Sequence, residues 1–88
     1  MDDEKRRNML RLLVRCRSGE RIQLTFCDAR EAKYYFCEYA TWLSLHYRGA
    51  YDRVIRANGN NEIRFKGGGV LYFDSIYQYR DGVSLWKG

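Results

Sequence analysis

Two kinds of hydrophobic pattern alternate along this 88-residue chain. Apolar side chains recur at every second position in residues 9–26 and again in residues 51–76, which is the pattern of half-buried β-strands. Between these stretches, residues 28–48 carry apolar side chains every three or four positions, the spacing of an amphipathic helix. The pattern therefore predicts strands, then one helix, then further strands.

Residues 28–48 are predicted to form the only substantial helix. Asp28 can accept a hydrogen bond from the amides of the first turn and Glu31 can reach back to it, which makes a capping box. Gly49 is suited to ending the helix. The apolar side chains gather on one face, which we expect to cover the sheet: Ala29, Ala32, Phe36, Tyr39, Ala40, Leu43 and Tyr47.

Residues 9–26 are predicted to form an antiparallel hairpin with its turn at residues 18–20. An odd-length loop there lets the apolar residues of both strands share one face, whereas a two-residue loop would bury arginines. The same register places Arg17 directly opposite Arg21 on the outer face. Like charges opposed in this way destabilise a sheet, so this pair indicates an anionic partner.

Residues 51–57 and 62–66 flank a turn rich in asparagine and glycine and are predicted to form a second hairpin. Two registers fit the pattern, because either Ile55 or Val54 can lie opposite Ile63. The sequence does not distinguish these two registers.

The triple glycine that follows is predicted to be a plain turn into a strand at residues 70–76, with Phe65 opposite Leu71. The last apolar positions, in residues 77–86, are predicted to form a short terminal hairpin around an Asp-Gly turn. The second half of the chain is therefore expected to consist of strands alone.

These elements predict a single α+β domain spanning residues 1–88, with residues 1–8 as a charged, frayed leader. The expected architecture is an antiparallel sheet of about five to six short strands with one helix packed on one face, in the order ββαβββ plus a short terminal hairpin. The expected contacts place helix residues over sheet residues: Phe36, Tyr39, Ala40 and Leu43 over Val14, Leu24, Ile63 and Phe73.

The composition favours a folded intracellular protein. No apolar run approaches the roughly 18 residues of a membrane span, and the charged start is not followed by a signal-type segment. Cys16, Cys27 and Cys37 lack the spacing of a metal site and are expected to be reduced thiols. We therefore expect a cytoplasmic protein without a membrane partner, a bound metal or a disulfide framework.

Catalytic chemistry has little support in the sequence. His46 is the only histidine, and no serine or cysteine can be placed beside it as a nucleophile. The triple glycine is not followed by the lysine and hydroxyl residue of a phosphate-binding loop. We therefore expect a non-enzymatic binding protein that uses no cofactor.

Positive charge is the clearest functional indication. Sixteen lysine and arginine residues against eleven aspartate and glutamate residues give a net charge of +5, which suits an anionic partner. Cations that follow phosphates and rings that stack on bases are how sheet surfaces bind single strands. The basic and aromatic residues predicted on the outer sheet face are Arg11, Arg15, Arg17, Arg21, Arg64, Lys66 and Tyr72. They predict binding to nucleic acid or a nucleoprotein complex, with RNA and DNA both open.

A second interpretation changes the target of binding. Tyr35, Trp42 and His46 share one flank of the predicted helix, where they either border the core or contact a partner. In the latter case the protein is an inhibitor that docks on a host protein through this flank. The oligomeric state is left open by both interpretations.

Residues 54–83, VIRANGNNEIRFKGGGVLYFDSIYQYRDGV, resemble the strand pair that precedes the acidic ATPase motif in the large-subunit DNA-packaging terminases of phages. The resemblance covers about a third of the chain and does not extend to the ATPase motifs. It implies a phage or mobile-element setting without ATPase activity. Small phage-encoded inhibitors of host defence, such as anti-CRISPR-like proteins, are similar in size, which agrees with the inhibitor interpretation.

Overall fold

The chain begins with a helix, α1 (Asp3–Arg17), and not with a leader and a strand. Asp2 caps the helix, because its carboxylate accepts a hydrogen bond from the Lys5 amide at 2.8 Å. The buried side chains have helical spacing: Met9, Leu12, Leu13 and Cys16. Val14, which we expected in the core, is 60% exposed. The predicted frayed leader and first hairpin are therefore wrong.

The misleading alternation has a simple cause. Leu12 and Cys16 belong to both patterns, since positions four apart share a face in a helix as well as in a strand. The prediction of a strand depended on Leu10 and Val14. In the structure Leu10 is half-buried and Val14 is exposed. Because Arg17 ends a helix, the like-charge pair that we predicted between it and Arg21 does not form.

The sheet has five strands in the order β2-β3-β4-β1-β5, and it is mixed. Its strands are β1 (Arg21–Phe26), β2 (Tyr51–Ile55), β3 (Glu62–Phe65), β4 (Val70–Ser75) and β5 (Ser84–Leu85). The β2-β3-β4 part is antiparallel, whereas β1 runs parallel to both β4 and β5. The predicted all-antiparallel sheet is therefore wrong: β1 has no hairpin partner before it and lies between β4 and the edge strand β5.

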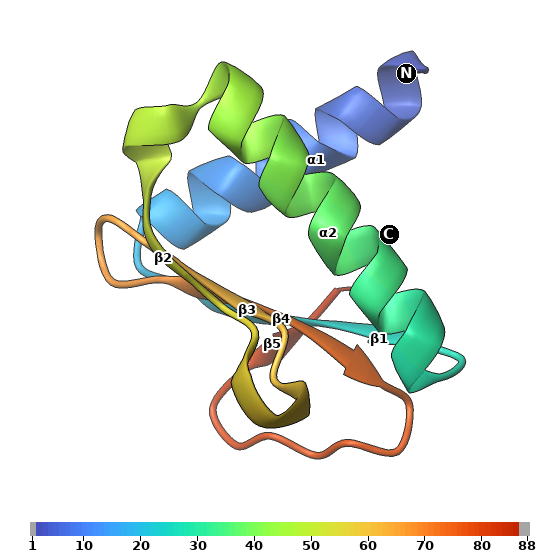
Figure 1. Cartoon of the computed structure of the whole chain (residues 1–88). Coiled ribbons are helices and arrows are strands. Elements are labelled where there is room, and N and C mark those ends of the chain that lie inside the picture. Colours follow the sequence, from blue (N-terminus) through green and yellow to red (C-terminus); the bar gives the residue numbers. More distant parts are fainter. Residues whose placement is uncertain (1, 87–88) are drawn as a thin grey trace.

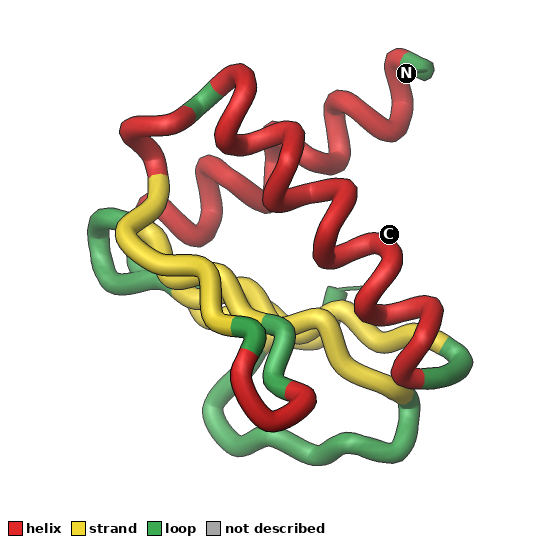
Figure 2. The backbone as a smooth tube through the Cα atoms, in the orientation of Figure 1, coloured by secondary structure: helices red, strands yellow, loops and turns green. Residues whose placement is uncertain are grey.

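The computed structural model describes residues 2–86 and shows two layers (Figure 1). Both α1 and the second helix, α2 (Ala29–His46), lie on the same face of the sheet (Figure 1). The loop between β4 and β5, residues 76–83, crosses below the opposite face (Figure 2). The prediction of one covering helix is wrong because α1 completes the helical layer. Within residues 2–86, no helix is long and apolar enough to cross a membrane.

The central helix agrees closely with its prediction. Asp28 accepts a hydrogen bond from the Glu31 amide at 2.8 Å, and α2 ends at His46, two residues before the predicted end. Two aromatic contacts join it to β4: the Phe36 and Tyr39 rings lie against Phe73 at 5.6 and 5.9 Å between centroids. Every residue that we named for the core except Val14 is buried in one hydrophobic cluster: Leu24, Phe36, Tyr39, Ala40, Leu43, Ile63 and Phe73.

The strand registers differ in part from those predicted. Val54 lies opposite Ile63, which decides between the two open registers, and a short 3-10 helix, η2 (Ala57–Gly59), makes the connection. Ile63 also lies opposite Leu71, so the predicted pairing of Phe65 with Leu71 is wrong by two residues. The sheet faces stay the same under this shift because side chains alternate with a period of two.

The end of the chain forms no hairpin. Ile22 and Gln23 of β1 pair in parallel with Ser84 and Leu85 of β5, so the predicted terminal hairpin is wrong. The other connection, from α2 to β2, contains a 3-10 helix, η1 (Arg48–Ala50). Because β5 pairs with β1 and not with residues 77–80, residues 76–83 form a loop over the outer sheet face.

The three thiols differ in burial, which predicts their reactivity. Cys16 is fully buried, and burial raises the pKa of its thiol to about 12, whereas Cys27 and Cys37 are exposed. We expect iodoacetamide at pH 8 to alkylate two thiols in the native protein and the third only after unfolding, because the thiolate is the nucleophile. Mass spectrometry counts the adducts. A Cys27→Ser/Cys37→Ser variant is the control, and rapid alkylation of Cys16 in it would contradict the placement.

Candidate functional site

The sheet register decides which side chains share the face turned away from the helices. Residues directly opposite in neighbouring strands point to the same face. Arg53 of β2 lies opposite Arg64 of β3, Arg64 lies opposite Val70 of β4, and Val70 lies opposite Arg21 of β1. Arg53, Arg64 and Arg21 therefore lie on one line across four neighbouring strands, in which β4 contributes Val70, and we call these three residues the arginine row.

Two members of the arginine row are directly opposed like charges. Arg53 and Arg64 are both exposed, and their pairing is unfavourable unless an anion lies between them. Arg64 is partly compensated, because its Nε donates a hydrogen bond to the Glu62 carboxylate at 3.1 Å. Arg21 donates a hydrogen bond to the Tyr72 hydroxyl at 2.9 Å. The row thus keeps more positive charge than its neighbours neutralise.

A buried polar cluster lies beside the arginine row, under the 76–83 loop. Asp74 is 1% exposed and accepts two hydrogen bonds from Arg80, at 2.5 and 2.9 Å, and one from the Gln23 amide at 2.8 Å. The bonded carboxylate raises the pKa of Arg80. The Arg80 guanidinium lies over the Tyr72 ring, 4.0 Å from its centroid. Removing Arg80 would leave the buried Asp74 carboxylate without a positive partner, so this cluster fixes the loop.

Of the seven residues predicted for nucleic-acid binding, three lie on the outer sheet face and four do not. Arg21, Arg64 and Tyr72 share the outer sheet face, but Tyr72 is buried beneath Arg80 and offers no free ring face. The other four lie elsewhere: Arg11, Arg15 and Arg17 on α1, and Lys66 in the turn after β3. Arg15 forms an ion pair with Glu20, which raises the pKa of Arg15 and lowers that of Glu20.

Sequence reasoning missed three residues of the outer face. Arg53 depends on the β2 register and on the irregularity between Tyr51 and Arg53, which the pattern could not show. Tyr77 and Tyr79 were assigned to a terminal hairpin, yet both are exposed on the 76–83 loop. The signal that could have found them is the density of tyrosine in Tyr-Gln-Tyr-Arg, directly before the Asp-Gly turn.

The flank named for the alternative, protein-binding interpretation lies beside α1. Trp42 is 7% exposed and packs against the His46 and Tyr47 rings. Tyr35 stacks on Phe26 with 5.2 Å between ring centroids. Of the three predicted residues, only Tyr35 and His46 therefore present substantial surface.

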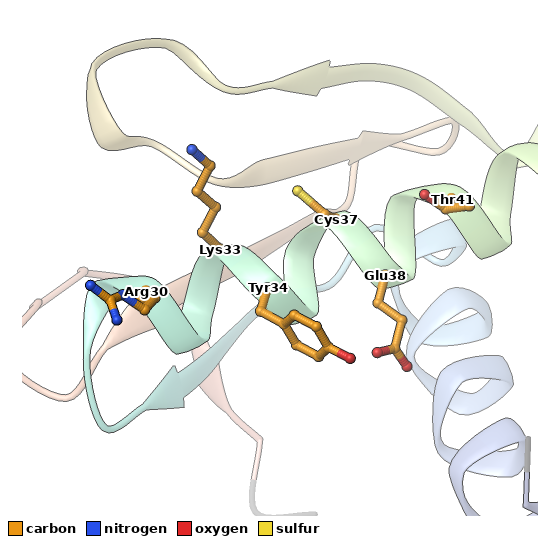
Figure 3. A pocket seen from close by; sticks show the side chains of 6 residues that line it. All are labelled: Arg30, Lys33, Tyr34, Cys37, Glu38 and Thr41. Atoms are coloured by element: carbon orange, nitrogen blue, oxygen red, sulfur yellow. The ribbon is translucent and has the colours of Figure 1, made fainter.

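A shallow hollow of about 500 Å³ lies on the outward side of α2 (Figure 3). All of its lining side chains come from this one helix: Arg30, Lys33, Tyr34, Cys37, Glu38 and Thr41. Glu38 is engaged by Lys5 of α1, and this ion pair raises the pKa of Lys5. The hollow is lined by exposed or partly buried residues only, so it has none of the buried polar support found on the outer sheet face.

Residues 2–86 bring no three histidine, cysteine, aspartate or glutamate side chains together as metal ligands. Comparisons with protein-family models, with curated proteins and with solved structures found no match. The arginine row and the loop beside it are thus characterised by their own geometry alone.

Proposed function

We propose that the protein is a non-enzymatic binding protein for nucleic acid or a nucleoprotein complex, and that the arginine row contacts the phosphates. The observation that best supports this proposal is that Arg53 and Arg64 lie directly opposite each other on neighbouring strands, and that both side chains are exposed. Folding gains nothing from this arrangement, whereas a phosphate between the two guanidinium groups would turn repulsion into two charge-assisted hydrogen bonds.

The chemistry of the row favours phosphates over single carboxylates. Arginine presents a planar fork of donors that matches phosphate oxygens. Arg53, Arg64 and Arg21 are spread over four neighbouring strands, of which β4 contributes the uncharged Val70. Strands lie about 4.8 Å apart, so the row spans roughly 14 Å, the length of several phosphates in a polymer. The net charge of +5 also supports attraction of a polyanion.

The proposal includes a cytoplasmic location, where the two exposed thiols, Cys27 and Cys37, would remain reduced. The alternative, docking on a host protein through the Tyr35 and His46 flank, is kept as an outcome of the experiment below.

The experiment compares two double variants that remove equal charge from different faces. Arg53→Gln/Arg64→Gln alters the arginine row, and glutamine keeps an N–H that can donate to Glu62. Arg30→Gln/Lys33→Gln alters the outward side of α2. Affinity for a labelled 12-nucleotide single strand is measured at several salt concentrations. Each lost phosphate contact reduces the salt slope by about 0.7, so we expect a reduction of about 1.4 in the first variant only.

Equal effects of the two double variants would contradict the proposal, because binding would then depend on net charge and not on the arginine row. An absence of binding by the parent protein at low salt would refute nucleic-acid binding altogether. In that case, the inhibitor interpretation becomes the better account of the protein.

A further inference from the structure

The 76–83 loop presents two aromatic rings to solvent. Tyr77 is 85% exposed and Tyr79 is 84% exposed, and they are separated by a single residue. Ile76, beside them, is also largely exposed. Scattered apolar residues are normal on a surface, but consecutive large ones in a short loop mark an interaction site. The core gains almost nothing from these rings.

The loop that carries the rings is firmly held at several points. The Ile76 amide donates to the Phe26 carbonyl at 2.8 Å, at the end of β1. The Gln78 side-chain oxygen accepts a hydrogen bond from the Ser75 amide at 2.8 Å, and the Gln78 backbone carbonyl accepts one from the Gln23 side chain at 3.2 Å. Two residues further on, Arg80 is bound to the buried carboxylate of Asp74. The rings are therefore offered from a fixed backbone, which lowers the entropy lost on binding.

A hollow of about 570 Å³ adjoins the rings, between the loop and the β1–β5 edge of the sheet. Its polar lining includes the side chains of Gln23, Gln78 and Arg80, and Tyr79 forms part of its wall. Gln23 and Arg80 already donate to Asp74, and the Gln78 side-chain oxygen already accepts from Ser75, so the Gln78 NH2 group is the donor that can reach an acceptor on a base edge. The hollow is large enough for a base next to one stacked on the rings.

The charge around the rings narrows the class of partner. Arg80 follows Tyr79 directly in the sequence, and its guanidinium lies over the Tyr72 ring. Arg21, on the strand next to that of Tyr72, also contacts this ring and donates a hydrogen bond to its hydroxyl. Through Arg21, the loop is continuous with the arginine row. One carboxylate is also present, because the Tyr79 hydroxyl donates a hydrogen bond to Asp81 at 2.8 Å. Arg21 and Arg80 outnumber it, so the two rings and the cations beside them fit a partner in which flat bases are joined by phosphates.

We propose that this face binds single-stranded nucleic acid in preference to duplex, with unstacked bases lying on Tyr77 and Tyr79 while the arginine row holds the phosphates. The inference rests on the proposed function and names its substrate class. Bases in a duplex are already stacked on each other and cannot offer their faces, whereas those of a single strand can. Stacking on an aromatic side chain tolerates every base, so we expect little sequence preference.

The test compares Tyr77→Ala/Tyr79→Ala with Tyr77→Phe/Tyr79→Phe, which keeps the rings and loses only the hydroxyls. The probes are labelled 12-nucleotide single strands of DNA and of RNA, and a 12-base-pair DNA duplex. Loss of one base–ring stack weakens binding roughly 5- to 150-fold, so we expect the alanine variant to bind single strands at least about 25-fold more weakly. We expect the phenylalanine variant to stay within about threefold of the parent, and the salt slope to be unchanged in both.

Tyr34→Ala is the matched control, because Tyr34 is also exposed but lies on α2, in the opposite layer. It should leave affinity unchanged. A second measurement needs no variant: a single strand containing 5-iodouracil should photo-crosslink to Tyr77 or Tyr79 of the parent protein, as mapped by mass spectrometry. The preference between DNA and RNA shows whether the sugar is read.

Two results would overturn this inference while leaving the proposed function intact. One is unchanged single-strand affinity in the alanine variant although Arg53→Gln/Arg64→Gln weakens binding. The other is duplex binding as tight as single-strand binding in the parent. Failure of the parent to bind any of the three probes would overturn the inference together with the proposed function.

Discussion

Replacement of Phe36 by alanine is expected to lower the free energy of unfolding by about 3 to 5 kcal/mol. Phe36 is buried in α2, its ring lies 5.6 Å from that of Phe73, and the Arg56 guanidinium covers it at 5.5 Å. The substitution removes a large apolar side chain and leaves a cavity between the helical layer and the sheet. Small domains have a total free energy of unfolding of only about 5 to 15 kcal/mol, so this substitution removes a large fraction of the stability of the fold.

Urea unfolding followed by circular dichroism measures this loss as a shift of the transition midpoint. Tyr34→Ala on the same helix is the control, since Tyr34 is 63% exposed and should cost less than about 1 kcal/mol. A Phe36→Ala midpoint equal to that of the control would show that α2 does not cover the sheet through this residue.

Replacement of Gly69 by alanine is expected to destabilise the protein by about 3 kcal/mol or more. A Cβ atom at Gly69 would lie 1.9 Å from the backbone carbonyl oxygen of Cys16, and one at Gly67 would lie 2.1 Å from that of Arg17. In both cases the new Cβ atom meets a backbone atom, so no flexible side chain can move aside. The triple-glycine turn thus lets the C-terminal end of α1 pack against the start of β4.

Gly49→Ala provides the control, because no atom lies within 4 Å of a Cβ placed there. We expect the free energy of unfolding of that variant, measured by thermal melting, to lie within about 0.5 kcal/mol of the value for the parent protein. Full stability of Gly69→Ala would contradict the close approach of α1 to the turn, and with it the replacement of the predicted first strand by a helix.

The predictable parts of the fold are those in which one periodic pattern is unambiguous. The helix α2 has a capping residue, Asp28, and a continuous apolar face, and both are found in the structure. The alternation of β1 correctly places Ile22 and Leu24 inward, but Gln23 is buried as well because the 76–83 loop covers it. A covering loop of this kind leaves no periodic signal.

The missed parts depend on contacts between distant segments. The sequence near Leu12 fits a strand and a helix equally, and only packing against α2 and β1 decides for the helix. Once this helix is misassigned, β1 receives a false hairpin partner, and its parallel pairing with β4 cannot be found. An antiparallel hairpin is the expectation for neighbouring strands, whereas parallel pairing needs an intervening crossover.

The same distinction applies to the candidate site. Arg21, Arg64 and Tyr72 were placed on the correct face because each lies in a true strand whose alternation was recognised. Arg15 and Arg17 were not, since they belong to α1. The like-charge argument that we first made for one arginine pair applies instead to Arg53 and Arg64, which only the three-dimensional register brings together.

The most direct test of the central claim is a titration of ¹⁵N-labelled protein with a 12-nucleotide single strand, followed by amide chemical shifts. Perturbations should concentrate at Arg53, Arg64 and the 76–83 loop and should leave the outward side of α2, marked by Arg30 and Lys33, unaffected. Perturbations confined to α2, or no perturbation at low salt, would contradict the assignment of the outer sheet face as a nucleic-acid interface.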